Sequence, residues 1–234
     1  MKLNQRLLQC TLALGLVVGA MVGASWAADT NNQSDIAKRI DASAKVLDEI
    51  MATPDKAIPD SVIKRATCVA VFPSTIQVAV LVGAKHGKGV ATCRTAKGWS
   101  APAPVDLSGG SWGAQLGGED VDLVMVITTD KGMQQFTSSK FNLGTETSVT
   151  AGPVGNHEWK MNSDVLTYSR SKGAFAGTNF SGSSVTEDES DTLNLYGSPV
   201  SLADILGGKT RTPGVGQPFL AAVEKYAGPR KPRD

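Results

Sequence analysis

The fold of this chain is decided by the stretch from Gly83 to Gly118, which reads GAKHGKGVATCRTAKGWSAPAPVDLSGGSWGAQLGG. Nine of its thirty-six residues are glycine, and no helical period runs through it. Trp99 and Trp112 make it too aromatic for a flexible linker. Glycines that separate short apolar runs are typical of β-strands with tight turns and bulges. The stretch therefore predicts a folded β-core, with a glycine hairpin turn over residues 83–89.

On both sides of this stretch the apolar pattern has a period of two, as expected for strands. Strands are predicted at residues 68–72, 76–82, 90–94, 105–107, 121–128, 145–151, 165–168, 174–180 and 183–186. Helical patterns are found at residues 59–66, 130–138, 201–206 and 218–226. The predicted class is α+β and mainly antiparallel β, with a closed or sandwiched sheet and with N-terminal and C-terminal helices packed on it.

Short motifs in a fixed order connect this chain to a known family. They are Gly87-Lys88-Gly89-Val90, Gly98-Trp99-Ser100-Ala101-Pro102, Gly110-Ser111-Trp112-Gly113-Ala114-Gln115-Leu116-Gly117, Leu143-Gly144, Ala151-Gly152-Pro153-Val154-Gly155, Tyr168-Ser169-Arg170-Ser171-Lys172-Gly173, Phe175-Ala176-Gly177 and Tyr196-Gly197. By these motifs residues 58–226 resemble the SYLF domain family. That family includes eukaryotic lipid-binding and actin-binding proteins and many secreted bacterial proteins. The resemblance implies a binding domain rather than an enzyme.

The first 27 residues have the pattern of a secretory signal peptide. Lys2 and Arg6 precede an apolar run, and small residues lie before the expected cleavage site between Ala27 and Ala28. The alternative is a membrane anchor, but the run is shorter than the roughly 20 residues that span a bilayer. We therefore expect a periplasmic or secreted protein, which can be peripheral on a membrane.

The mature chain is long enough for one domain, and it contains two cysteines. Its nearly neutral net charge gives no indication of a nucleic-acid partner. In an oxidising compartment, Cys68 and Cys93 suggest one disulfide, with two buried free thiols as the alternative.

Residues 28–57 form an N-terminal segment with an amphipathic helical pattern that begins at Asp35. Its apolar face can dock on the β-core or lie on a membrane surface, as is thought for eukaryotic relatives. Membrane-surface helices have a strongly basic polar face. Here acidic and basic residues are mixed, so docking is favoured. At the other end, residues 227–234 form a basic tail.

No stretch of the sequence fits a catalytic or metal site well. Ser111 lies in a G-x-S-x-G pattern, but a strand, not a helix, is expected to follow it, so a hydrolase is a distant alternative. His86 and His157 have no further ligand at a metal-binding spacing. The acidic run at residues 187–191 is interpreted as a solvated turn rather than a calcium site. No cofactor or metal is expected.

One charge pattern suggests a binding site. Residues 61–105 contain no acidic residue and six basic ones, namely Lys64, Arg65, Lys85, Lys88, Arg94 and Lys97. The last four could converge on one rim around the predicted turn and attract phosphate headgroups. The alternative is that they keep a glycine-rich sheet soluble.

Together these features predict a secreted, non-enzymatic domain that binds anionic phospholipid headgroups, of the phosphoinositide type that the family resemblance implies. The main alternative is an envelope scaffold that binds protein through the surface near Trp99 and Trp112. Actin is not expected as a partner, because a periplasm offers none.

Overall fold

The structure is a computed structural model. It describes residues 26–53, 58–138, 140–144, 148–151, 163–171, 174–175 and 180–229, with the backbone alone for residues 26–34, 77–83, 111–119, 149, 151 and 174–175. The elements are α2 (Trp26–Met51), α3 (Asp60–Ile63), β1 (Cys68–Thr95), β2 (Gly98–Trp99), β3 (Ala103–Ile127), α4 (Asp130–Phe136), β4 (Lys140–Asn142), β5 (Val149–Ala151), β6 (Val165–Ser171), β7 (Ala174–Phe175), β8 (Ser183–Glu187), α5 (Glu189–Tyr196), α6 (Leu202–Leu206), the 3-10 helix η1 (Gly214–Gly216) and α7 (Gln217–Ala227).

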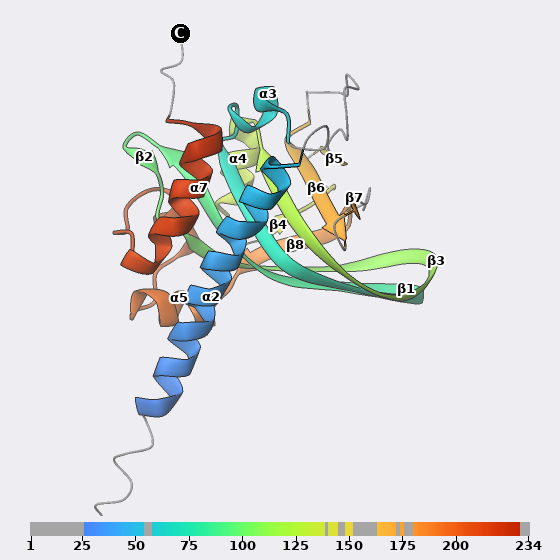
Figure 1. The fold of residues 1–234 in the computed structure, drawn as a ribbon, viewed down its shortest axis with the longest axis horizontal. Helices are drawn as coiled ribbons and strands as arrows, with labels where there is room; N and C mark the ends of the chain where they lie inside the picture. Colours follow the sequence, from blue (N-terminus) through green and yellow to red (C-terminus); the bar gives the residue numbers. More distant parts are fainter. Residues whose placement is uncertain are drawn as a thin grey trace, which may run out of the picture.

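Two very long strands dominate the sheet. β1 and β3 pair antiparallel from Cys68 opposite Ile127 to Ala91 opposite Ala103, with register shifts near Phe72 and Ala79. The ribbon that they form runs outward and then folds back (Figure 1). The separate short strands expected at residues 68–72, 76–82 and 90–94 are therefore parts of one strand.

The prediction of a hairpin turn over residues 83–89 is wrong. These residues lie inside β1, and each of them pairs with a residue of β3. A Cβ atom on Gly89 would lie 2.6 Å from the carbonyl oxygen of Val71, and one on Gly87 would lie 2.5 Å from Oγ1 of Thr75. These glycines are required because the returning half of β1 packs closely against its outgoing half.

The remaining strands complete a curled, mainly antiparallel sheet. The strand order is β2-β1-β3-β6-β5; β8 pairs with another part of β3, β4 pairs with β8, and β7 pairs with β6. Only the pairing of β5 with β6 is parallel among the described strands. The predicted α+β class is confirmed.

Each face of the sheet covers its own apolar core, which follows from the period of two. Val69 and Val71 belong to the core beneath the helices, whereas Cys68, Ala70 and Phe72 belong to the core on the other face. A strand that is buried on both faces contains a continuous apolar run, and the sequence has one here.

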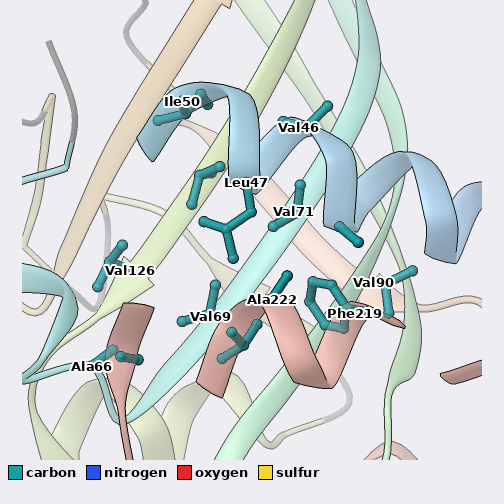
Figure 2. Close-up of a cluster of buried hydrophobic side chains, with 14 of the residues drawn as sticks. Val46, Leu47, Ile50, Ala66, Val69, Val71, Val90, Val126, Phe219 and Ala222 are labelled. Carbon is teal, nitrogen blue, oxygen red and sulfur yellow. The ribbon is translucent and has the colours of Figure 1, made fainter. Parts of the chain in front are cut away.

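The N-terminal and C-terminal helices pack on one face of the sheet, as expected. Ile36, Ile40, Leu47 and Ile50 of α2 are fully buried. Figure 2 shows α2 side chains meeting Val71 of β1, with Phe219 and Ala222 of α7 in the same cluster. The amphipathic stripe of α2 is therefore docked on the core. No helix within the described ranges is both long and apolar enough to cross a membrane.

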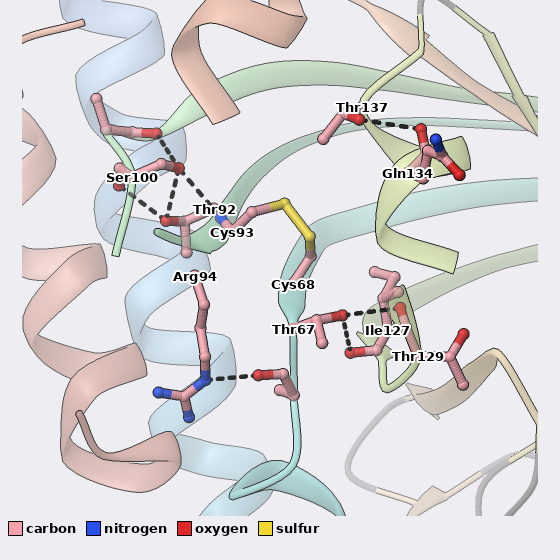
Figure 3. Close-up of a disulfide and its surroundings, with 12 residues drawn as sticks. Thr67, Cys68, Thr92, Cys93, Arg94, Ser100, Ile127, Thr129, Gln134 and Thr137 are labelled. Carbon is pink, nitrogen blue, oxygen red and sulfur yellow. Dashed lines mark hydrogen bonds between the residues drawn. A yellow bond between two sulfur atoms is a disulfide. The ribbon is translucent and has the colours of Figure 1, made fainter. Parts of the chain in front are cut away.

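A disulfide joins Cys68 and Cys93, whose Cα atoms are 4.0 Å apart (Figure 3). The cysteines lie at opposite ends of β1, rather than on different strands. Beside them the backbone N–H of Arg94 donates to the carbonyl oxygen of Thr67 at 2.7 Å. The bridge therefore fastens the two ends of the folded-back strand to each other.

Candidate functional site: a basic cleft

The six basic residues that the sequence singled out do not form one exposed rim. Lys85 is buried, with 6% of its surface exposed. Its Nζ lies 4.8 Å from the ring centroid of Phe180, and burial lowers the pKa of its ammonium group. The expected turn would have left this side chain in solvent, whereas a position inside the curled strand buries it.

Lys88 is held in an ion cluster with acidic residues of the α5 N-terminus. Its Nζ lies 2.6 Å from Asp188 and 3.1 Å from Asp191. Arg39 of α2 contacts the same two carboxylates, at 3.3 and 2.7 Å. The cluster connects α2, β1 and α5, so the charge of Lys88 is neutralised within the fold.

The interpretation of residues 187–191 as a solvated acidic turn is wrong. Asp188 and Asp191 are only 3% and 7% exposed. Asp188 also caps α5, because its Oδ1 accepts from the backbone N–H of Asp191 at 3.0 Å. Burial alone would raise the pKa of Asp188, but hydrogen bonds with Asp191 and Lys88 outweigh it and hold that pKa well below its ordinary value.

Replacing Asp188 with asparagine is expected to reduce the free energy of unfolding by roughly 2 kcal/mol at neutral pH, because charge-assisted hydrogen bonds are lost. The folded-state pKa lies below the unfolded one. The contribution is therefore present above about pH 3.9 and disappears as the pH falls through the folded-state pKa. Urea denaturation across this range should show the difference between wild type and Asp188→Asn shrinking in acid. The control, Asp35→Asn, removes an exposed pair with Lys38 and should have little effect at any pH. A difference that did not depend on pH would contradict this assignment.

The guanidinium group of Arg94 donates hydrogen bonds to backbone carbonyl groups at the ends of two helices. Its Nε donates to the carbonyl oxygen of Ala66 at 2.6 Å, beyond the end of α3 (Figure 3). Its Nη atoms donate to Ala227 at 2.6 Å and Gly228 at 2.8 Å, at the end of α7. Carbonyl groups at a helix C-terminus have no partner within the helix. Arg94 satisfies them, and its guanidinium also lies 4.4 Å from the ring of Trp99.

The other three predicted basic residues are exposed. Lys97 lies in the turn between β1 and β2, and Lys64 and Arg65 follow α3. Lys64 pairs with Asp60 at 2.5 Å. Lys64, Arg65 and Arg94 line one open cleft, whereas Lys85, Lys88 and Lys97 do not.

This cleft has a volume of about 1680 Å³ and lies between α3, α4 and the C-terminal end of α7. Sequence reasoning missed two of its basic residues, Lys131 of α4 and Lys225 of α7. Both are exposed. The walls come from residues 60–67, 94, 128–137 and 225–229. Because these segments are far apart in the sequence, no local pattern could have indicated the cleft.

The cations of the cleft differ in how they are paired. Lys225 Nζ lies 2.9 Å from Asp48 of α2. The hydroxyl of Tyr226 donates to the same carboxylate at 2.6 Å, and these two bonds lower the pKa of Asp48. Within the part of the chain that the structure describes, Arg65 and Lys131 form no salt bridge. Lys131 also acts on Asp164: burial alone would raise the pKa of that carboxyl group, but hydrogen bonds from Thr129 and Ser148, together with the charge of Lys131, outweigh the effect of burial and lower the pKa.

The other candidate sites do not gain support from the structure. Ser111 lies in the middle of β3, not at a strand-to-helix turn, so the nucleophile-elbow context is absent. Trp99 is partly buried in the core beneath the helices, and its Nε1 donates to Gly228. The side chain of Trp112 and all of His157 lie outside the described residues. Among the residues described, no group of three His, Cys, Asp or Glu side chains could hold a metal ion.

The comparisons with known proteins agree on one family. The Ysc84 family model, described as "Las17-binding protein actin regulator", matches residues 108–226. The human SH3 domain-containing YSC84-like protein 1 is 30% identical over 205 residues, which cover 82% of this chain and 60% of the relative. The yeast Protein YSC84 and LAS seventeen-binding protein 3 are each 31% identical over 182 residues, which cover 74% of this chain and 39% of each relative. The chain thus spans less than two thirds of these relatives' length.

These names correct one expectation. From the sequence, actin is not expected as a partner. The matching family is described as an actin regulator, and a yeast relative is named for binding Las17. The exclusion of actin-related partners was wrong, because it rested on the assumed compartment and not on any residue.

Proposed function

Because the chain belongs to the Ysc84 family, which is the SYLF family, we propose that it is a non-enzymatic binding domain whose basic cleft binds anionic phospholipid headgroups. The proposal includes the export expected from residues 1–27. The matching family is described as a Las17-binding protein, and one yeast relative is named LAS seventeen-binding protein 3. The lipid ligand is inferred from the chemistry of the cleft.

The observation that carries the proposal is the set of four exposed cations around one open cleft, namely Lys64, Arg65, Lys131 and Lys225. A lysine or arginine near an anionic membrane contributes on the order of 1 kcal/mol to binding. Arg65 and Lys131 form no salt bridge among the described residues, so no salt bridge must be broken when they bind phosphate, although the charge of Lys131 also acts on the carboxylate of Asp164.

A protein partner is the second candidate, and the relatives' names favour it. A family described as Las17-binding suggests that this chain also recognises a polypeptide. An acidic segment of such a partner would be attracted by the same cations. The two candidates differ in whether vesicles of anionic lipid are sufficient for binding.

We expect Arg65→Glu/Lys131→Glu to reduce binding to phosphatidylserine-containing vesicles at least about tenfold, because two attractive charges become repulsive. The matched control is Lys38→Glu/Lys45→Glu, which changes the net charge equally on the exposed face of α2. Cosedimentation with phosphatidylcholine vesicles, with and without phosphatidylserine, gives the measurement. Binding should also weaken between 0.1 M and 1 M salt, as the screening length falls from about 10 Å to about 3 Å.

Two results would overturn the lipid proposal. If wild type does not sediment with anionic vesicles at low salt, the cleft does not bind headgroups and a protein ligand is the better assignment. If only the α2 variant loses binding, the membrane contact lies on α2 instead of the cleft.

A further inference from the structure

Two of the helices that bound the basic cleft have their C-terminal ends beside it. α3 ends at Ile63 and α7 at Ala227, and the residues that follow each end line the cleft. The last carbonyl groups of a helix have no partner within the helix, and they give its C-terminus a partial negative charge. For a helix as long as α7 this charge is up to about half an electronic charge. Such ends repel phosphate unless their carbonyl groups are neutralised.

One side chain reaches both ends. Nε of Arg94 donates to the carbonyl oxygen of Ala66 at 2.6 Å, just after α3. Its two Nη atoms donate to Ala227 at 2.6 Å and to Gly228 at 2.8 Å, at the end of α7. A guanidinium group has five N–H donors in a rigid plane, so it can hold carbonyl groups that lie in different directions. Its positive charge also offsets their partial negative charge.

Arg94 is itself held firmly in place. The residue before it, Cys93, is joined to Cys68 by the disulfide (Figure 3). The backbone N–H of Arg94 donates to Thr67 at 2.7 Å. The ring of Trp99 lies 4.4 Å from the guanidinium, and its indole N–H donates to the end of α7. A side chain that is fixed before a ligand arrives does not have to be ordered when the ligand binds.

The cations of the proposed headgroup site lie on the same two ends. Lys64 and Arg65 directly follow α3, and Lys225 lies in the last turn of α7. All three line the cleft. Their spacing depends on how the two ends are held, and Arg94 is bonded to both. We propose that Arg94 is the positioning residue of the cleft: it neutralises the two helix ends and fixes the spacing of the cations that bind an anionic headgroup. This role rests on the proposed function.

A role as one more phosphate contact fits Arg94 less well. Nε and both Nη atoms already donate to backbone carbonyl groups. A phosphate that took these donors would leave the carbonyl groups without them, and an unsatisfied polar group is costly where water does not replace the lost donor. Arg94 therefore acts through the residues that it holds.

Arg94→Lys separates positioning from charge. Lysine keeps the positive charge, but its single nitrogen cannot reach the ends of α3 and α7 together. In cosedimentation at low salt, the affinity for phosphatidylserine-containing vesicles should fall roughly fivefold or more, because each cation that moves out of reach costs about that factor. Trp99→Leu is a milder variant that keeps every charge, and its affinity should fall in the same direction. It carries the test if circular dichroism shows that Arg94→Lys does not fold.

The control for a general loss of stability is Leu195→Ala. Leu195 is buried in α5, outside the cleft, so this variant should be less stable but should bind vesicles as wild type does. If wild type binds and Arg94→Lys binds equally well, the positioning role is wrong and the proposed function stands. If wild type itself does not bind, the proposed function fails.

Spin labels test the geometry without any ligand. They are attached to Ser61→Cys/Glu224→Cys in a Cys10→Ser background, because both positions are exposed and lie on α3 and α7. The disulfide-bonded cysteines do not react with the label. Electron–electron resonance should give a narrow distance distribution for the otherwise unchanged chain and a broader or longer one when Arg94→Lys is added. An unchanged distribution would overturn the positioning role even if the affinity fell, since the guanidinium would then be a direct contact of the ligand.

Discussion

Gly89→Val is expected to lower the free energy of unfolding by about 3 kcal/mol or more. Valine has a high strand propensity, so local preference alone would favour this change in β1. However, a Cβ at this position would lie 2.6 Å from the carbonyl oxygen of Val71 and would overlap the ring of Phe72. Both neighbours are fully buried, so neither has room to move away. The two halves of β1 would have to separate.

Thermal and urea denaturation measure this effect, and roughly 3 kcal/mol corresponds to a fall in Tm of about 6–12 °C for a chain of this size. Gly214→Val is the matched control. This glycine lies in η1, has open space around its Cβ position and does not have a positive φ. It should change stability far less. Equal effects of the two substitutions would mean that the close crossing of β1 does not restrict side-chain size at Gly89.

Removing the disulfide is expected to have the second largest effect. In Cys68→Ala/Cys93→Ala the loop of 25 residues is no longer closed in the unfolded chain. The chain-entropy relation gives a loss of roughly 3 kcal/mol for a loop of this length. Both cysteines are fully buried, and alanine also removes their packing. The bridge joins the two ends of β1, so its loss should weaken the folded-back ribbon as a whole.

Urea denaturation of wild type, with and without a reductant, and of the double variant provides the test. Reduced wild type should resemble the variant, apart from the small packing contribution of the sulfur atoms. If the unfolding midpoint of the variant matched that of the oxidised protein, the bridge would not contribute to stability. Cys68→Ala alone should behave like the double variant, since one cysteine cannot form the bridge.

Much of the fold was predictable from local sequence patterns. The amphipathic period after Asp35 predicted the helix α2. The mixed charges on its polar face predicted that the helix docks on the core, and the structure confirms this. The period-two runs around residues 68–72 and 121–128 gave strands, and Cys68 and Cys93 gave the bridge. These features depend on neighbours within a few residues, because helix and strand periods are set by backbone geometry.

The candidate site was only partly predictable. Lys64 and Arg65 were found because residues 61–105 contain basic residues and no acidic residue. Lys85 and Lys88 shared that property, but one is buried against Phe180 and the other is neutralised by Asp188. No local sequence pattern distinguishes Lys131 and Lys225. They line the cleft only because the first turn of α4 and the last turn of α7 lie beside α3.

The sequence by itself determined the α+β class, the family, the helix that docks and the cysteines that can pair. Only the tertiary structure decided that Gly87 and Gly89 serve a close crossing of β1 and not a turn. The lack of a Cβ atom permits both a sharp turn and a close approach, and the choice depends on residues that pack from elsewhere. The tertiary structure also decided which charged side chains are already paired within the fold. Whether a lysine is free to bind a ligand depends on carboxylates about a hundred positions away, which a local pattern does not contain.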